Sequence, residues 1–293
     1  MTRLDENTSR SEDLKKILED TLDFEYEMGL AVVDLRSDII GKYQIFGHNM
    51  DHQIYPASLS KVFIGAAVVN GIVNGEINPH HKIEVATENV VDTDLRVFLG
   101  DTRPLLEASE SVTVAYLLDL MLSRSDNTAS NVLIDFLGRD RINERIITRN
   151  GWQGSEVTRK YMPAHLEPQE FRNAKLMLGQ ARHFAEFFFR VATGSFATAE
   201  IFRKCTGEYN ENKKGLWLPG YYTSYYRKGG RHDSKLRDGR IGHYLHDAGI
   251  VVGVKSCYVV VLMTLDKNNG PESTFPMQKL AQKLFDYMES YKY

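Results

Sequence analysis

The sequence predicts an α+β fold whose sheet is built from both ends of the chain. Strand-like runs of β-branched and aromatic residues occur near both ends, the segments between them have helical periodicity, and a helix is expected at each terminus. Residues 1–56 and 209–293 are therefore predicted to form a discontinuous sheet domain, and residues 57–208 an inserted helical domain. An active site at the seam of the two domains is expected.

The individual elements follow from local patterns. At the N-terminus, Leu14, Ile17 and Leu18 have helical spacing behind serines that can cap, which predicts a helix within residues 8–25. The last helix is expected after a Gly-Pro break. The predicted strands are residues 29–35, 42–47, 221–227, 247–254 and 258–264, and the other clear helices are 57–70, 113–122, 128–138, 180–193 and 276–290. Residues 231–245 are expected to form a lengthened hairpin loop.

Composition excludes several classes of protein. The chain has 293 residues, of which 42% are hydrophobic and 26% charged, as in an ordinary globular protein. A formal net charge of -3 argues against nucleic acid or an anionic membrane as the main partner. No apolar run is long enough to span a bilayer. Two cysteines, Cys205 and Cys257, imply no disulfide framework; reduced core thiols are expected, with a single bridge as the alternative.

Ser58 and Lys61 lie at the polar beginning of a long predicted helix that is otherwise apolar. Pro56 suits a helix start, so Ser58 is expected in the first turn with Lys61 one turn later on the same face. Backbone donors at a helix start can stabilise an oxyanion. A lysine drawn partly out of water can accept a proton, because burial disfavours the ammonium. The alternative is a capping serine and a lysine that extends to solvent.

Two further segments carry polar groups at the ends of predicted elements. Ser125, Asp126 and Asn127 follow one predicted helix and precede the next, where they could equally be an ordinary capping loop. Lys228, followed by Gly229 and Gly230, ends a predicted strand. The alternative there is a flexible turn.

In this order, S-x-x-K, S-D-N and a Lys-Gly strand end resemble the motif triple of class A β-lactamases and penicillin-binding proteins. The segments YPASLSK, LLDLMLSRSDNTASNVLID, ARHFAEFFFRVATG, GLWLPG and HDAGIVV also resemble family segments in family order. The resemblance implies a β-lactamase/transpeptidase-like fold, with an antiparallel sheet flanked by N- and C-terminal helices and an inserted all-α domain. It also implies a serine hydrolase.

By this resemblance, Ser58 would attack a carbonyl carbon and become acylated. Lys61 would take its proton, directly or through a water. Ser125 would relay a proton to the leaving nitrogen, and Asn127 would hold Lys61 and the substrate amide. Lys228 would add positive potential near a substrate carboxylate.

The oxyanion hole, by resemblance, would use the backbone N–H groups of Ser58 and of Arg231, just after Gly229-Gly230. The expected substrate is a small molecule or peptide, either a β-lactam or a peptidoglycan-like amide, with no cofactor and no metal. We expect a monomer. Family members act mostly outside the cytoplasmic membrane, whereas the first residues lack the apolar stretch of a secretory signal, so the location stays open.

Two departures from the family pattern bear on the substrate. The third motif usually has Thr or Ser where this chain has Gly229, so a substrate carboxylate would need another partner, such as Arg231 or His232. The glutamate that activates the hydrolytic water in class A enzymes is matched only approximately. Glu167 is the first candidate, although no Leu-Asn follows it, and Glu170 is the second.

If neither glutamate reaches Ser58, the acyl-enzyme would hydrolyse slowly. The protein would then resemble a penicillin-binding D,D-peptidase or an esterase. A catalytically idle binding protein is the third hypothesis, but it predicts loss of the nucleophile, the lysine or the S-D-N segment, and all three are intact. A metal site at His232, His243, His246 and Asp247 is not expected, because their spacing is irregular and no cysteine joins them.

Overall fold

The computed structural model describes residues 3–21, 26–36, 43–98, 101–194, 224–236, 239–267 and 274–290. Residues 221–223 of one predicted strand, the GLWLPG segment and Cys205 lie outside these ranges. The chain divides into two compact units. The sheet unit is Met1–Leu59, Gly179–Thr193 and Lys214–Tyr293, and the helical unit is Ser60–Leu178 and Gly194–Lys213.

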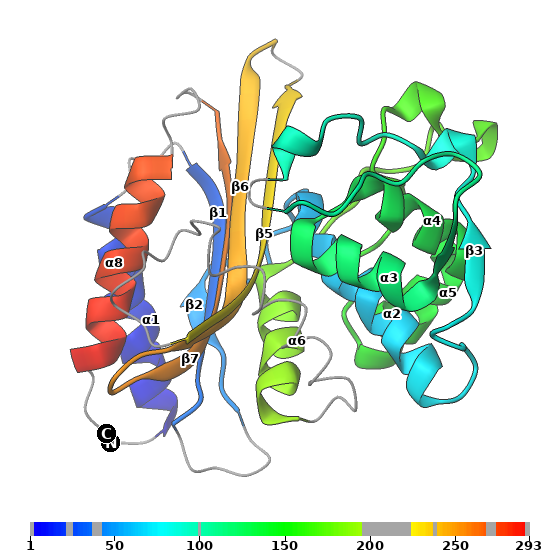
Figure 1. The fold of residues 1–293 in the computed structure, drawn as a ribbon. Coiled ribbons are helices and arrows are strands. Elements are labelled where there is room, and N and C mark those ends of the chain that lie inside the picture. Colours follow the sequence, from blue (N-terminus) through cyan, green and yellow to red (C-terminus); the bar gives the residue numbers. More distant parts are fainter. Residues whose placement is uncertain are drawn as a thin grey trace. The chain divides into compact units, whose positions relative to one another are not determined.

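The sheet unit contains a five-stranded antiparallel sheet in the order β2-β1-β7-β6-β5 (Figure 1). Its strands are β1 (Tyr26–Asp34), β2 (Phe46–His48), β5 (Ser224–Lys235), β6 (Ile241–Val252) and β7 (Cys257–Asp266). Strands from both ends of the chain pair directly, because β1 lies against β7 from Tyr26↔Asp266 to Asp34↔Tyr258. The predicted α+β class, with an antiparallel sheet flanked by the N- and C-terminal helices, is confirmed.

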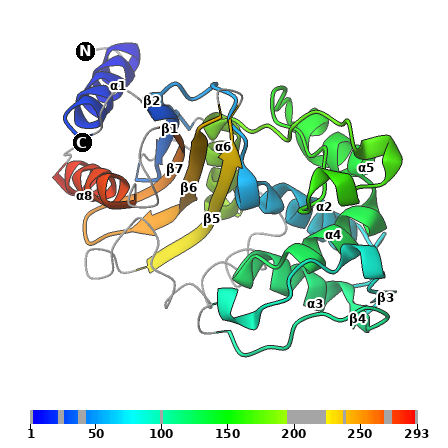
Figure 2. The same ribbon diagram turned by 90° about the horizontal axis from the view of Figure 1, so that it is seen from above.

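Helices cover both faces of this sheet (Figure 2). On one face, α1 (Arg3–Glu19) and α8 (Thr274–Ser290) pack side by side, and Leu14, Leu30 and Leu280 belong to their shared core. Side chains alternate between faces along a strand, so Ala31 and Val33 face away from this core. That second face is covered by α6 (Ala181–Thr193).

The helix α6 was expected in the inserted helical domain, but it belongs to the sheet unit. Its apolar side chains, including Phe184 and Phe188, are fully buried on one side of the helix. Gly29 of β1 allows close approach, since a Cβ there would lie 3.3 Å from the Cβ of Ala181. Packing of this apolar stripe against the sheet therefore decides where the helix belongs.

The segment after Gly230 also differs from the prediction. Instead of a lengthened loop, β5 and β6 pair without interruption to Lys235↔Ile241. Ladder pairing satisfies the backbone hydrogen bonds of the hairpin arms, which a loop of that length would leave to solvent. The polar residues of this stretch, among them His232 and His243, therefore stand on strands.

The helical unit is built around the buried helix α2 (Lys61–Val73), which packs against α4 (Asn127–Leu137) and α5 (Arg139–Ile142). Its other helical elements are η2 (Thr87–Asn89), η3 (Leu95–Val97), α3 (Val114–Asp119), η4 (Leu120–Arg124), η5 (Asn143–Thr148), η6 (Ala164–Leu166) and η7 (Gln169–Phe171). A short ribbon pairs β3 (Lys82–Glu84) with β4 (Ser111–Thr113). None of the described helices is long and apolar enough to cross a membrane.

Candidate active site

The S-D-N segment lies at the junction of two helices in the helical unit. The π-helical turn η4 ends at Arg124, and Ser125 adopts a left-handed conformation with φ 64°. Asp126 then caps α4, since its Oδ1 accepts a hydrogen bond from the backbone N of Ala129 at 2.7 Å. A non-glycine residue with positive φ stores strain that the surrounding contacts must hold.

Lys61, the first residue of α2, gathers this segment around its amine. The side chain is fully buried, and Nζ donates to the backbone O of Ser125 at 2.6 Å and to Oδ1 of Asn127 at 2.7 Å. The Oγ of Ser125 lies 3.3 Å from the same nitrogen. Ser125 and Asn127, which are 64 and 66 positions from Lys61 in the chain, therefore meet at its buried amine.

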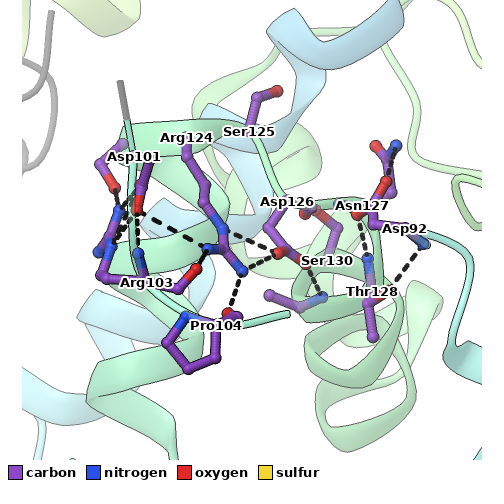
Figure 3. Close-up of polar contacts among 12 residues, drawn as sticks. Asp92, Asp101, Arg103, Pro104, Arg124, Ser125, Asp126, Asn127, Thr128 and Ser130 are labelled. Atoms are coloured by element: carbon purple, nitrogen blue, oxygen red, sulfur yellow. Dashed lines mark hydrogen bonds and ion pairs between the residues drawn. The ribbon is translucent and has the colours of Figure 1, made fainter. Parts of the chain in front are cut away.

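A buried ionic network underlies the same segment (Figure 3). The guanidinium of Arg124 is fully buried, and its Nη2 lies 2.7 Å from Oδ2 of Asp126. Its Nη1 donates to the carbonyl oxygen of Arg103 at 2.8 Å, and Nη2 donates to that of Pro104 at 3.0 Å. Burial and the charge of Asp92 raise the pKa of Asp126, and the pairing with Arg124 opposes that rise.

Two residues near the amine carry no motif signal and were not predicted from the sequence. The ring of Tyr161 lies under Lys61, with Nζ 4.5 Å from its centroid, and its hydroxyl is 2.7 Å from Oγ of Ser60. The carboxylate of Asp92 accepts hydrogen bonds from both the backbone and the side chain of Asn127. Both residues come from loops, where only the tertiary structure defines the neighbours.

Both carboxylate oxygens of Glu167 are bound by other residues of the helical unit. The buried carboxylate pairs with Nη2 of Arg139 at 2.7 Å and accepts from the backbone N of Lys160 at 2.6 Å. Within the described part of this unit, no hydrogen bond or ion pair joins Glu167 to Lys61 or to the S-D-N segment. Glu170 is exposed, in η7.

Ser58 lies in the sheet unit's part of the 3-10 turn η1 (Ala57–Ser60), one turn before α2 begins. The turn is closed by a hydrogen bond from the backbone N of Leu59 to Pro56 O at 3.0 Å. Ala57 has φ 47°, so the residue before Ser58 is held in a left-handed conformation. The prediction placed Ser58 in the first α-helical turn, whereas the tighter 3-10 geometry precedes the helix.

Gly230 lies directly against this turn. A Cβ at Gly230 would stand 2.8 Å from Pro56 O, 3.1 Å from the backbone N of Leu59 and 3.2 Å from that of Ser58. All three are backbone atoms, which cannot move aside as a flexible side chain could. Glycine is therefore required for β5 to reach the backbone donors at Ser58.

Lys228 and Gly229, the other residues of the third motif, have contacts of their own. Lys228 is buried, and its Nζ lies 3.2 Å from Gly229 O. A Cβ at Gly229 would lie 2.5 Å from Nη2 of Arg227, so a guanidinium fills the space beside the position where the family has a hydroxyl. Arg227 pairs with the buried Asp247, Nε to Oδ1, at 2.8 Å.

Arg231 and His232 were the predicted alternatives for binding a carboxylate. Arg231 is exposed on β5. His232 packs edge-to-face on Tyr55 at 5.2 Å between ring centroids, and burial lowers the pKa of its imidazole, which favours the neutral ring. Of the two, Arg231 therefore has the charge suited to an anion.

The other two histidines of this hairpin, His243 and His246, have local partners. His246 is buried, donates through Nε2 to Tyr55 O at 2.8 Å and accepts at Nδ1 from the backbone N of Thr264 at 3.1 Å. His243 pairs with Asp233 at 2.8 Å. Across the described ranges, His, Cys, Asp and Glu side chains form no group of three or more suited to a metal ion.

Comparison with known proteins supports the fold. A family described as the beta-lactamase enzyme family matches residues 9–288. The structure is similar to TLA-1 extended-spectrum β-lactamase, with a TM-score of 0.75 at 15% identity over 97% of this chain and 99% of the other. It is also similar to a representative class A β-lactamase from Bacteroides cellulosilyticus DSM 14838, with a TM-score of 0.74 at 17% identity over 97% and 99%.

A third similar structure is a point mutant of PBP-A, solved as an acyl-enzyme complex with penicillin G. Its TM-score is 0.73 at 16% identity over 97% of each chain. At these identities the likeness concerns the fold alone. The search of curated protein sequences found no similar protein.

Proposed function

The chain belongs to the β-lactamase enzyme family, and from this premise we propose that it is a serine hydrolase that forms an acyl-enzyme on Ser58. The proposed substrate is a β-lactam or a related amide or peptide. The observation that carries the proposal is the buried amine of Lys61, hydrogen-bonded to Asn127 and Ser125 within the helical unit. An amine held this way three residues after a serine suits a nucleophile–base pair.

In the proposed reaction, Ser58 Oγ attacks the carbonyl carbon while its proton passes to the neutral amine of Lys61. The oxygen of the tetrahedral intermediate accepts hydrogen bonds from the backbone N–H groups of Ser58 and Arg231. Ser125 relays that proton from Lys61 to the leaving nitrogen, and the carbon–nitrogen bond breaks. Lys228 adds positive potential for a substrate carboxylate. Water then cleaves the ester, releasing the acid and restoring Ser58.

A second candidate function concerns the fate of the ester. The carboxylate of Glu167 is committed to Arg139 and to the backbone of Lys160, which favours slow deacylation. The protein would then behave like a penicillin-binding D,D-peptidase or an esterase that β-lactams acylate. A catalytically idle binding protein is the remaining alternative, and it is disfavoured because Ser58, Lys61 and the S-D-N segment are all present.

Mass spectrometry after brief exposure to penicillin or a fluorophosphonate tests the proposal. We expect an adduct on Ser58 in the native protein and none in Ser58→Ala. A chromogenic cephalosporin then separates rapid turnover from a long-lived adduct. Absence of any adduct on Ser58, in protein whose fold is intact by circular dichroism, would leave the idle binding protein as the better description.

A further inference from the structure

We propose that Asp92 is a positioning residue that fixes which way the side-chain amide of Asn127 faces. The inference rests on the proposed function, because the oriented amide is the one that binds Lys61. Nothing in the motif pattern points to Asp92, which lies in the loop between η2 and η3, 35 residues before Asn127 in the chain.

The carboxylate of Asp92 divides its two oxygens between backbone and side chain (Figure 3). Oδ2 accepts from the backbone N of Asn127 at 2.5 Å and of Thr128 at 3.1 Å, at the start of α4. Oδ1 accepts from Nδ2 of Asn127 at 3.0 Å. In return, Thr128 Oγ1 accepts from the backbone N of Val91 at 3.1 Å and of Asp92 at 3.2 Å. The loop at Asp92 and the start of α4 are therefore joined by hydrogen bonds in both directions.

The orientation of Asn127 follows from donor and acceptor chemistry. The two ends of an amide are nearly equal in shape, so their partners decide which way it faces. An ionised carboxylate can only accept, which requires the NH2 group of Asn127 to face Asp92. The oxygen then faces the opposite way, toward Nζ of Lys61 at 2.7 Å.

An amide in place of the Asp92 carboxylate could not do the same. The backbone N–H groups of Asn127 and Thr128, at the positive end of α4, would take the single oxygen of the introduced amide. The NH2 of that amide would then face the NH2 of Asn127, and the Asn127 side chain would have to turn over. The turned side chain would present a donor to Lys61 in place of an acceptor.

Asp92→Asn should therefore disfavour the ammonium form of Lys61 in two ways. The amine loses an acceptor, and the site loses a negative charge. The charged and aromatic groups that the described residues place beside them include Asp126 with its partner Arg124 at the start of α4, and the ring of Tyr161 under the amine. The substitution also relieves Asp126 of a neighbouring charge that raises its pKa, so the swapped variant described below, together with the pH profile, assigns the effect to the amide.

The experiment measures the rate of Ser58 acylation by a chromogenic cephalosporin from pH 5 to 9. For Asp92→Asn we expect the acylation rate at pH 7 to fall by at least about 10-fold. The acid limb of its pH–rate profile should move to lower pH by roughly one unit. Asp94→Asn is the matched control, because Asp94 is in the same loop and pairs only with Arg96 among the described residues. An unchanged rate and profile for Asp92→Asn would overturn the proposal.

A swapped variant separates positioning from general damage to the fold. Asn127→Asp alone places two carboxylates together, whereas Asp92→Asn combined with Asn127→Asp restores one donor and one acceptor and keeps an oxygen toward Lys61. We expect the double variant to react faster and unfold at a higher temperature than either single variant. If the effects simply add, the proposal is wrong.

The unfolding measurement distinguishes failure of this inference from failure of the proposed function. If native protein forms no adduct on Ser58, the proposed function fails, while the melting temperatures of the single and swapped variants still test the Asp92–Asn127 pairing. If Ser58 is acylated but the swap rescues neither rate nor stability, the proposed function stands and the positioning role falls.

Discussion

The carboxylate of Glu167 is paired with the guanidinium of Arg139, with Oε2 2.7 Å from Nη2, in a part of the helical unit closed to solvent. Its second oxygen accepts from the backbone N of Lys160, so the side chain ties two segments together. A carboxylate whose two oxygens are both bound in this way has a structural role. Whether it also activates water can be decided by comparing stability with deacylation.

Glu167→Gln is expected to lower the free energy of unfolding by about 3 kcal/mol, because the buried charge of Arg139 loses its partner. The decay rate of the Ser58 adduct in the folded fraction should change less than about threefold. Urea denaturation and adduct lifetime measure the two effects. Glu170→Gln, on an exposed glutamate, is the control and should change neither. Unchanged stability with abolished deacylation would instead make Glu167 the general base.

Arg124→Met removes the cation from the network under Ser125. The buried carboxylate of Asp126 loses its partner, which is expected to cost about 3 to 5 kcal/mol of stability. The pKa of Asp126 is already raised by burial and should rise further, so the folded state resists ionisation while the unfolded state ionises freely. The loss relative to the native protein should therefore be greater at pH 7.5 than at pH 5.

Urea titrations at the two pH values check this prediction for Arg124. Arg96→Met, which removes an exposed arginine paired with Asp94, should be nearly neutral at both. A loss for Arg124→Met that is equal at pH 5 and pH 7.5 would show that packing, and not the charge of Asp126, dominates.

Gly230→Ala and Gly229→Ala form a matched pair on β5. At Gly230 the new methyl group meets the backbone of Pro56, Ser58 and Leu59, so the turn that carries the nucleophile must shift. Acylation should fall by about 100-fold, the usual effect of losing an oxyanion donor. At Gly229 the close contact is with the flexible tip of Arg227, while the backbone O of His246 stands at an ordinary 3.5 Å, and a loss below about 10-fold is expected. Equal losses in both variants would contradict the contact argument.

The stability of the protein should fall as the pH drops from about 6.5 to about 4, in part through His246. Burial lowers the pKa of this imidazole from 6.5 to about 4, so the unfolded state binds a proton first as the pH falls. Stability from the neutral ring is complete above pH 6.5 and lost progressively toward pH 4, amounting to about 3 kcal/mol. Denaturation midpoints between about pH 4 and 7.5 measure it.

His246→Gln should weaken this acid dependence while costing stability at neutral pH, because glutamine does not titrate. Part of the dependence should remain, since burial also lowers the pKa of His183 to about 4. A variant whose stability falls with acid as steeply as that of the native protein would exclude His246 as the cause.

Local patterns predicted much of the fold. The continuous run of apolar and β-branched residues in the segment that became β7 and the helical spacing in the segments that became α4 and α8 were sufficient, because these patterns depend on neighbours in the chain. Helix α6 was recognised but assigned to the wrong unit. Its amphipathic stripe says that one face is buried and does not say against which partner.

The sequence by itself determined the α+β class, the order of the three motifs and the position of Lys61 at the head of an apolar helix. Each of these depends on residues close together in the chain. Only the tertiary structure decided the partners of those motifs: Asp92 for Asn127, Arg139 for Glu167 and Arg227 beside Gly229. In the first two pairs, a loop residue contacts a helix residue that is distant from it in the sequence. The third places a long side chain where the family has a short one. Hydrogen bonds and ion pairs act over a few ångströms, and which groups come that close is decided when the chain packs.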